Sequence, residues 1–356
     1  MASPYVRRPR KVSLKLVSVE GWSRSAVCGT LTAMNADKTP ELSVVLVATR
    51  AYALIRNAVR NLARQRDIPI ELVIAAPSAF ASSIDDQGKT DLASFARWQH
   101  VVVADDTPFD AARAAAVRAA SAPLVAFAED HSFPQPGWAA AIAAAFGDGV
   151  SVVGPVVQNG NPQSVTSRAN FLLEYGEWMP PGRPNGHKHL PGHNSAYRRD
   201  VLLALGDRLT TMIEAESVLH WELGRDGHRL IQEPRAVTRH VNFSRALPSL
   251  ALRYHLGRMF AARRAAHWPL TKRLAYAAAF PLVALIRVVR VARMGQNPGA
   301  MAEVVSALPM VGVMVTVSSL GEAVGNLTRA GGSTSDYLSD IEHDRHRFMR
   351  KGESVE

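Results

Sequence analysis

The chain has 356 residues, 47% of them hydrophobic, and a formal net charge of +10 at pH 7. This length suits one large domain with an appendage, or two domains. The single cysteine, Cys28, excludes a disulfide framework and a zinc site built from several cysteines, and it fits a reducing compartment. The basic N-terminus is not followed by an unbroken apolar segment, so no signal peptide is expected there.

Strands alternating with helices are predicted over the first two thirds of the chain. Residues 1–40 read as an N-terminal extension, with a strand at 12–19 and a loop at 21–35. Apolar, largely β-branched segments predict strands buried on both faces; they lie at 41–50, 69–76, 99–104, 124–128 and 149–157. Helices are expected between them, and a loop at 85–88. This alternation predicts an α/β fold with a mainly parallel sheet, whose ligand crevice lies outside the carboxyl ends of the strands.

The segment that follows is less regular. Residues 158–191 are rich in glycine, proline and asparagine, which predicts a long binding loop or lid. Helices are then expected at 201–205 and 213–223, and a closing strand pair at 228–234 and 236–240.

The C-terminal third is basic and helical. No acidic residue occurs between Glu233 and Glu303, although this interval holds twelve arginines and lysines. Helices are predicted at 247–259 and 274–294, the second kinked by Pro281. The apolar segment 304–320 falls slightly short of the roughly 20 residues that a transmembrane helix needs, so an interfacial or re-entrant helix is expected.

The basic excess has three possible explanations: an anionic membrane, nucleic acid, or a solvated surface without a partner. The apolar residues beside the arginines favour lipid, and the chain carries no nucleic-acid-binding motif, so no nucleic-acid partner is expected.

The chemistry is expected at the end of the strand at 124–128. That strand runs directly into Glu129, Asp130 and His131, and then into a Pro/Gly turn. Carboxylates suit Mg²⁺ or Mn²⁺, and imidazole suits Mn²⁺ better than Mg²⁺. The alternative is an acidic turn that faces solvent and binds nothing.

These landmarks and their order resemble the family 2 glycosyltransferases of the GT-A fold, over about residues 41–240. The residues that carry the resemblance are Thr49, Arg113, Glu129-Asp130-His131 followed by Pro136-Gly137-Trp138, and Glu216 with Leu219, Trp221 and Gly227. The resemblance implies a GT-A domain that binds a nucleotide-sugar donor through a divalent metal, Mn²⁺ or Mg²⁺.

The resemblance also assigns donor-side residues. It places Glu129, Asp130 and His131 at the metal and the diphosphate, with His240 completing the metal shell. It places Thr49 near the nucleotide. It further places Arg113 at the diphosphate. An exposed helical arginine and a structural histidine are the alternatives for Arg113 and His240.

On the acceptor side, the resemblance implies that Glu216 is the catalytic base of an inverting transfer. His193, Asn194 and Trp221 would line the acceptor pocket. For Glu216 the alternative is an ordinary acidic residue at a helix start, favoured by the helix dipole.

The domain boundaries are expected at 1–40 for the extension, 41–245 for the GT-A domain, 246–330 for a membrane-associated helical region and 331–356 for a flexible tail. Similar bacterial enzymes act at the cytoplasmic face of the inner membrane on lipid-linked or cell-envelope glycan acceptors, held peripherally or by a re-entrant helix. The alternative is a non-catalytic GT-A scaffold. It is motivated by residues that depart from the family pattern, among them Ala75, Ala114, Ala116 and Ala215.

Overall fold

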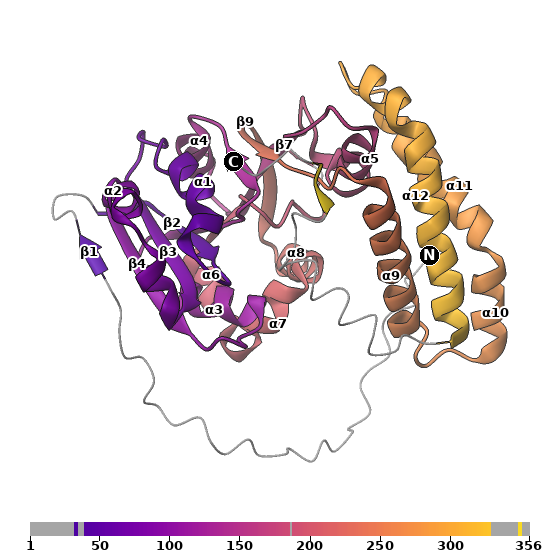
Figure 1. Cartoon of the computed structure of the whole chain (residues 1–356), viewed down its shortest axis with the longest axis horizontal. Coiled ribbons are helices and arrows are strands. Elements are labelled where there is room, and N and C mark those ends of the chain that lie inside the picture. The colour runs from indigo at the N-terminus through magenta and orange to yellow at the C-terminus, as the bar shows by residue number, and fades with distance from the viewer. Residues whose placement is uncertain (1–31, 35–38, 186, 329–347, 351–356) are drawn as a thin grey trace, which may run out of the picture.

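The computed structural model describes residues 32–34, 39–185, 187–328 and 348–350. A sheet flanked by helices forms one part of the molecule, and a bundle of C-terminal helices lies beside it (Figure 1). The expected strand at 12–19 and most of the expected tail fall outside the described residues.

Within the described residues the sheet has nine strands, in the order β1-β4-β3-β2-β5-β8-β7-β9-β6. Their bounds are β1 Thr32–Met34, β2 Leu42–Val47, β3 Ile70–Pro77, β4 Arg97–Val103, β5 Leu124–Ala128, β6 Ser132–Pro134, β7 Val150–Asn159, β8 Ala196–Arg198 and β9 Arg229–His240. The long strands pair in parallel: β2 with β3, β2 with β5, β3 with β4, and β7 with β9. The short strands β1, β6 and β8 pair antiparallel with their neighbours. The expected α/β class is therefore confirmed.

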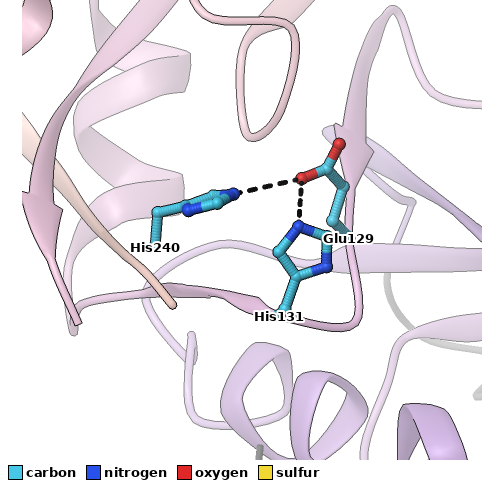
Figure 2. Close-up of side chains that lie close together, drawn as sticks. All are labelled: Glu129, His131 and His240. Atoms are coloured by element: carbon cyan, nitrogen blue, oxygen red, sulfur yellow. Dashed lines mark ion pairs between the residues drawn. The ribbon is translucent and has the colours of Figure 1, made fainter. Parts of the chain in front are cut away.

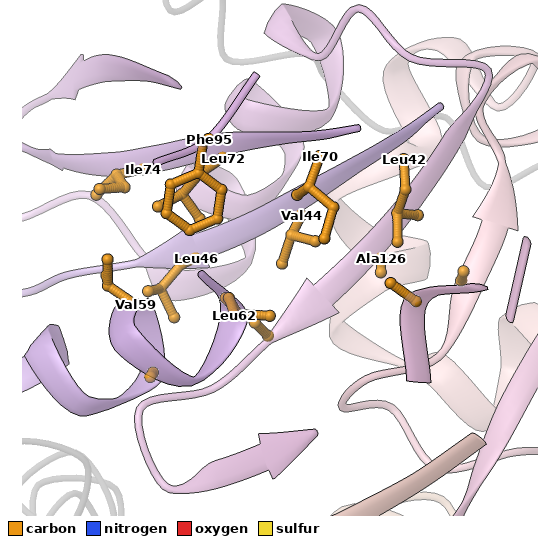
Figure 3. Close-up of a cluster of buried hydrophobic side chains, with 14 of the residues drawn as sticks. Leu42, Val44, Leu46, Val59, Leu62, Ile70, Leu72, Ile74, Phe95 and Ala126 are labelled. Atoms are coloured by element: carbon orange, nitrogen blue, oxygen red, sulfur yellow. The ribbon is translucent and has the colours of Figure 1, made fainter. Parts of the chain in front are cut away.

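Helices cover both faces of this sheet. In the sheet part their bounds are α1 Tyr52–Leu62, α2 Asp86–Ala93, α3 Phe109–Ala119, α4 Trp138–Ala144, α5 Val165–Glu174, α6 Arg199–Leu203, α7 Leu209–Glu214 and α8 Glu216–Arg225. Alternate residues of β2 enter different cores: Val44 packs with α1 and α4, and Val45 packs with α3. Figure 3 shows the first of these cores.

The structure corrects five expectations in this part. Strand β1 lies inside the loop predicted at 21–35, and the helix predicted at 213–223 is two helices, α7 and α8, which meet at Ala215. The predicted loop at 85–88 is wrong, because the Asp85 side chain accepts a hydrogen bond from the Gly88 N–H at 2.8 Å and caps α2. The predicted strand pair at 228–240 is one strand, β9. Residues 234–236 lie at a register shift between β7 and β9, where a proline without an N–H is tolerated.

The fifth correction concerns the segment 158–191, which is not simply a loop. Ser164 caps α5 by accepting a hydrogen bond from the Ser167 N–H, and a 3₁₀ turn follows at Gly176–Trp178. The glycines and prolines of the segment lie mostly after these helical turns, so its composition concealed them.

The C-terminal helices are α9 Ala246–Arg264, α10 Leu270–Ala278, α11 Phe280–Met294 and α12 Met301–Thr328. The break predicted at Pro281 is present: α10 and α11 meet at 53°, with the proline in the first turn of α11. Helix α12 has 28 residues, longer than expected, and is long and apolar enough to cross a membrane, although 39% of its apolar window is buried in the protein.

Helices α9 and α12 are in direct backbone contact. A Cβ added to Gly321 or Gly325 of α12 would overlap the backbone oxygen of Tyr254 or Arg258 on α9. Conversely, a Cβ at Gly257 of α9 would overlap the backbone oxygen of Ser318. Only glycine allows the two helices to approach this closely.

We therefore expect Gly321→Ala to destabilise the chain by about 1–3 kcal/mol, because α9 and α12 must separate to admit a methyl group. Gly312→Ala, in the same helix, is the matched control, since an added Cβ there meets nothing within 4 Å. It should be neutral or stabilise by up to about 1 kcal/mol, through helix propensity. Urea unfolding of both variants measures this, and equal effects would contradict it.

Candidate active site

Three side chains from distant parts of the chain meet at one edge of the sheet. Glu129 follows β5, His131 lies in the turn into β6, and His240 ends β9. The antiparallel pairing of β6 with β9 sets Ser132 opposite His240 and so brings the turn against the end of β9. The Glu129 Oε2 atom lies 3.1 Å from His131 Nε2 and 3.8 Å from His240 Nε2 (Figure 2).

These three residues could hold a divalent metal ion. One ligand atom from each lies within 4.8 Å of the others. Ligands at about 2.0–2.2 Å from an ion are separated from one another by roughly 3–4 Å, and the separations of 3.1 and 3.8 Å between Glu129 and the two histidines match this range. Two imidazoles and one carboxylate suit a transition ion such as Mn²⁺.

Asp130 is outside this group. Its Oδ1 atom lies 2.6 Å from His131 Nδ1, so the carboxylate can hold the imidazole with Nε2 turned toward Glu129. Carboxylates commonly orient a histidine ligand in this way. The Asp130 side chain is 42% exposed, which leaves it open to solvent.

A single guanidinium lies between Glu129 and Glu216. Arg113 on α3 contacts Glu216 Oε1 at 3.0 Å and Glu129 Oε1 at 3.4 Å, and its own side chain is 8% exposed. It also lies over the rings of Phe109 and Phe127. The structure thus brings Arg113, the acid cluster and Glu216 together.

The two carboxylates of this site differ in acidity. Burial raises the pKa of Glu129, but the neighbouring charges of His131, His193 and Arg113 outweigh it and hold that pKa well below its usual range. Burial also raises the pKa of Glu216; Arg113 lowers it, yet the net shift stays upward, with Glu129 adding to the rise. Glu129 is therefore suited to bind a cation and Glu216 to accept a proton.

Glycine at 192 makes room for Glu216. A Cβ at Gly192 would overlap the Glu216 carboxylate, so any other residue would displace either the carboxylate or the segment that carries His193 and Asn194. The candidate base is thus enclosed by Arg113 on one side and by this segment on another.

His193 and Asn194 contact the residues that position the candidate metal ligands. The His193 ring lies 4.8 Å from the His240 ring, and its Nδ1 atom lies 3.0 Å from Ser132 Oγ. Asn194 has a left-handed backbone with φ 53° and is fully buried. Its side-chain amide donates to Ser132 Oγ and Thr238 Oγ1, both at 2.7 Å, and so joins β6 to β9.

The other two expected residues lie further out. Thr49 is exposed just beyond the carboxyl end of β2, the strand next to β5. Trp221 is 52% exposed on α8. It lies five positions after Glu216, so the two side chains project in different directions from the helix.

Sequence reasoning missed Tyr175. Its ring packs against the His240 ring at 4.2 Å and the His193 ring at 4.9 Å. Tyr175 ends α5, inside the segment expected to be a loop. The serine cap before an amphipathic stretch was the signal that could have located α5.

Comparison with known proteins gives a distant likeness. No protein-family model and no curated protein sequence matches the chain. A mannosyltransferase from Pyrobaculum calidifontis, solved with GDP-Man and Mn²⁺, aligns at 17% identity and TM-score 0.46, over 88% of this chain and 84% of the other. Glucosyl-3-phosphoglycerate synthase from Mycobacterium tuberculosis, solved with Mn²⁺, UDP and glucosyl-3-phosphoglycerate, aligns at 21% identity and TM-score 0.36, over 60% and 75%. These activities belong to those two proteins.

A neutral histidine anchors the segment that carries His193. The Leu190 N–H donates to His220 Nδ1 at 3.2 Å, so the neutral ring carries its proton on Nε2, which lies 2.9 Å from the Tyr197 hydroxyl. Burial lowers the pKa of His220 to about 3. The imidazole therefore stays uncharged in the folded protein over most of the acidic range.

This arrangement predicts an acid-sensitive fold. Below pH 6.5 the unfolded chain protonates His220 but the folded chain does not, so the stabilisation present above pH 6.5 is lost as the pH falls toward about 3. Relative to His220→Gln, we expect the wild type to lose about 2 kcal/mol of unfolding free energy between pH 7 and about 4.5, from a limiting slope of about 1.4 kcal/mol per pH unit.

Urea unfolding at several pH values measures this difference. His267→Gln, at an exposed position, is the control and should follow the wild type. A gap between wild type and His220→Gln that does not change with pH would contradict the assignment of a neutral His220.

Proposed function

We propose that the chain is an inverting, metal-dependent glycosyltransferase of the family 2, GT-A type. It would move a sugar from a nucleotide-diphosphate sugar to an acceptor hydroxyl. The observation that carries the proposal is the meeting of Glu129, His131 and His240 on one side of Arg113 with Glu216 on the other. A cation site and a proton acceptor at one sheet edge are the two groups that such a transfer requires.

The donor would be held at the cation side. A divalent metal bound by Glu129, His131 and His240 would offset the charge of the nucleoside diphosphate that departs. Arg113 directs N–H donors at both carboxylates, Glu129 and Glu216. One of these N–H groups can instead donate to a phosphate oxygen of the donor. Asp130 and Thr49 are exposed at the same sheet edge, where the donor would contact them.

The acceptor would be activated by Glu216. The upward-shifted pKa of this partly buried carboxylate makes it a better proton acceptor than an exposed glutamate, and it ionises at a higher pH. Direct attack of the acceptor oxygen on the anomeric carbon, as the leaving diphosphate departs from the opposite face, inverts the configuration. His193 and Trp221 are the proposed acceptor-side residues. Asn194 would support His193, because both side chains hydrogen-bond to Ser132 Oγ.

We expect Glu216→Gln to lower transfer by about 10²- to 10⁴-fold, the usual range for a general base, while nucleotide-sugar binding is retained. Glu214→Gln is the matched control: this carboxylate is exposed at the end of α7, two residues earlier, and the variant should keep the wild-type rate. Release of nucleoside diphosphate with Mn²⁺ measures the rate, and calorimetry measures binding. An unchanged rate in Glu216→Gln would remove Glu216 as the base.

A screen of nucleotide sugars tests the proposal as a whole. Turnover of at least one donor in the presence of Mn²⁺ is expected. Binding without turnover of any donor would instead support a non-catalytic scaffold, the alternative motivated by alanines such as Ala114 and Ala116, both of which are buried in the core.

The acceptor would be lipid-linked or a cell-envelope glycan at an anionic membrane surface, on the cytoplasmic face of the inner membrane. Helices α10 and α11 support this, because they expose apolar side chains beside basic ones. The exposed apolar residues include Leu270, Leu274, Leu282, Leu285, Ile286 and Val289, and the exposed basic residues include Lys272, Arg290 and Arg293. Trp268 and Tyr276 pack together at 4.7 Å beside Lys272, an aromatic and basic combination typical of membrane interfaces.

The membrane proposal predicts lipid-dependent flotation. The chain should float with liposomes that contain anionic lipid, and less with neutral ones, since each lipid-proximal basic residue contributes about 1 kcal/mol. Leu285→Glu combined with Ile286→Glu should reduce binding at least about tenfold, because burial of one such side chain contributes about 1.5–3 kcal/mol. Leu54→Glu, equally exposed on α1, should have no effect. Equal flotation of all three proteins would exclude α11 as the contact surface.

A further inference from the structure

His240 is held by a residue that lies just beyond the end of its strand. Its Nδ1 atom lies 3.0 Å from the side-chain oxygen of Asn242, and both side chains are buried. The opposite ring nitrogen, Nε2, is directed at Glu129 Oε2. The question is which of the two nitrogens carries the proton, because only the unprotonated one can bind a metal.

The orientation of the Asn242 amide answers it. The amide nitrogen lies 3.0 Å from the backbone oxygen of His240, and a backbone oxygen can only accept a hydrogen bond. The same nitrogen donates at 3.0 Å to the side-chain oxygen of Asn159. That Asn159 atom is an oxygen, because it accepts from the backbone N–H of Asn161. The Asn242 atom facing His240 is therefore an oxygen, and His240 Nδ1 must be the donor.

Asn242 itself cannot turn. Its backbone N–H donates to Asn161 Oδ1 at 2.8 Å, and its backbone oxygen accepts from Asn161 Nδ2 at 2.8 Å. Asn159 and Asn161 both accept from the Ser167 hydroxyl on α5. This buried amide network fixes the Asn242 side chain in one orientation.

The two histidines of the centre are thus held alike. His131 has Nδ1 at Asp130 and Nε2 at Glu129; His240 has Nδ1 at Asn242 and Nε2 at Glu129. The geometry points to Asn242 as a positioning residue for the metal centre. It locks His240 in the Nδ1–H tautomer, so that Nε2 offers its lone pair beside Glu129. This inference rests on the proposed metal-dependent function and adds to it a residue outside the ligand set.

The test compares two substitutions in the same network. Asn242→Leu removes the acceptor for His240 Nδ1 at nearly constant volume. Ser167→Ala removes two hydrogen bonds from the network, to Asn159 and Asn161, but none to His240. Mn²⁺ binding to the nucleotide-free protein is measured by titration calorimetry, and the histidine tautomers by ¹⁵N NMR. His240→Gln identifies the His240 signals and gives the affinity without this ligand.

We expect Asn242→Leu to weaken Mn²⁺ binding about 10- to 100-fold, as loss of such supporting partners does elsewhere. Ser167→Ala should bind within about twofold of the wild type, even if it melts at a lower temperature. In the NMR spectra, His240 should carry its proton on Nδ1 in the wild type and in Ser167→Ala, and lose that preference in Asn242→Leu.

Three results would overturn the inference. They are wild-type Mn²⁺ affinity in Asn242→Leu, an equal loss of affinity in Ser167→Ala, and an Nε2–H tautomer of His240 in the wild type. If the wild type binds no Mn²⁺ at all, the proposed metal centre fails, whereas the NMR measurement still decides whether Asn242 sets the tautomer. The failures of the two proposals are therefore distinguishable.

Discussion

The candidate site depends on the antiparallel pairing of the short strand β6 with the end of β9. This pairing sets Ser132 opposite His240, and it is reinforced by the Asn194 amide, which donates to Ser132 on β6 and to Thr238 on β9. Asn194 is fully buried with a left-handed backbone, a conformation that asparagine tolerates better than most residues. Without the pairing of β6 with β9, His240 would not meet Glu129 and His131.

Charge balance is the second constraint. Two partly buried carboxylates, Glu129 and Glu216, share the Arg113 guanidinium, and burial alone would favour the neutral form of both. His131 adds its charge on the side of Glu129, and the two carboxylates consequently shift in opposite directions. Two carboxyl groups whose pKa values shift in opposite directions are typical of sites where one group binds a cation and the other accepts a proton.

The helical part is connected directly to this site. α9 begins shortly after His240, and α12 packs against α9 through glycines that leave no space for a side chain. α12 also contributes to the core that contains Phe171 and Leu172 of α5, the helix that ends at Tyr175 beside the His240 ring. Glu322 of α12 is buried and pairs with Arg287 of α11 at 2.5 Å, which joins the outer helix to the inner ones. The C-terminal helices are therefore linked to the candidate metal ligands through a continuous series of packing contacts.

The sequence by itself determined the α/β class and the position of the 129–131 turn at the end of a buried strand. These follow from local patterns: apolar runs such as 124–128 indicate a buried strand, and the acids after it must lie at its carboxyl end. It also indicated the break at Pro281, since a proline acts on the turn that contains it. The capped helices α2 and α5 were also locally encoded, but α2 is polar and α5 lies in a segment rich in glycine and proline, so neither was predicted.

Only the tertiary structure decided which groups meet. That Asp130 supports His131 while His240 joins Glu129 depends on the pairing of β6 with β9, and sequence spacing does not encode strand pairing between distant segments. The place of Tyr175 and the proposed role of Asn242 depend on rings and amides that converge from the C-cap of α5, from β7 and from the segment that follows β9. Such contacts depend on three-dimensional packing and on hydrogen bonding of buried polar groups. Neither requirement produces a periodic pattern in the sequence from which the contacts could be predicted.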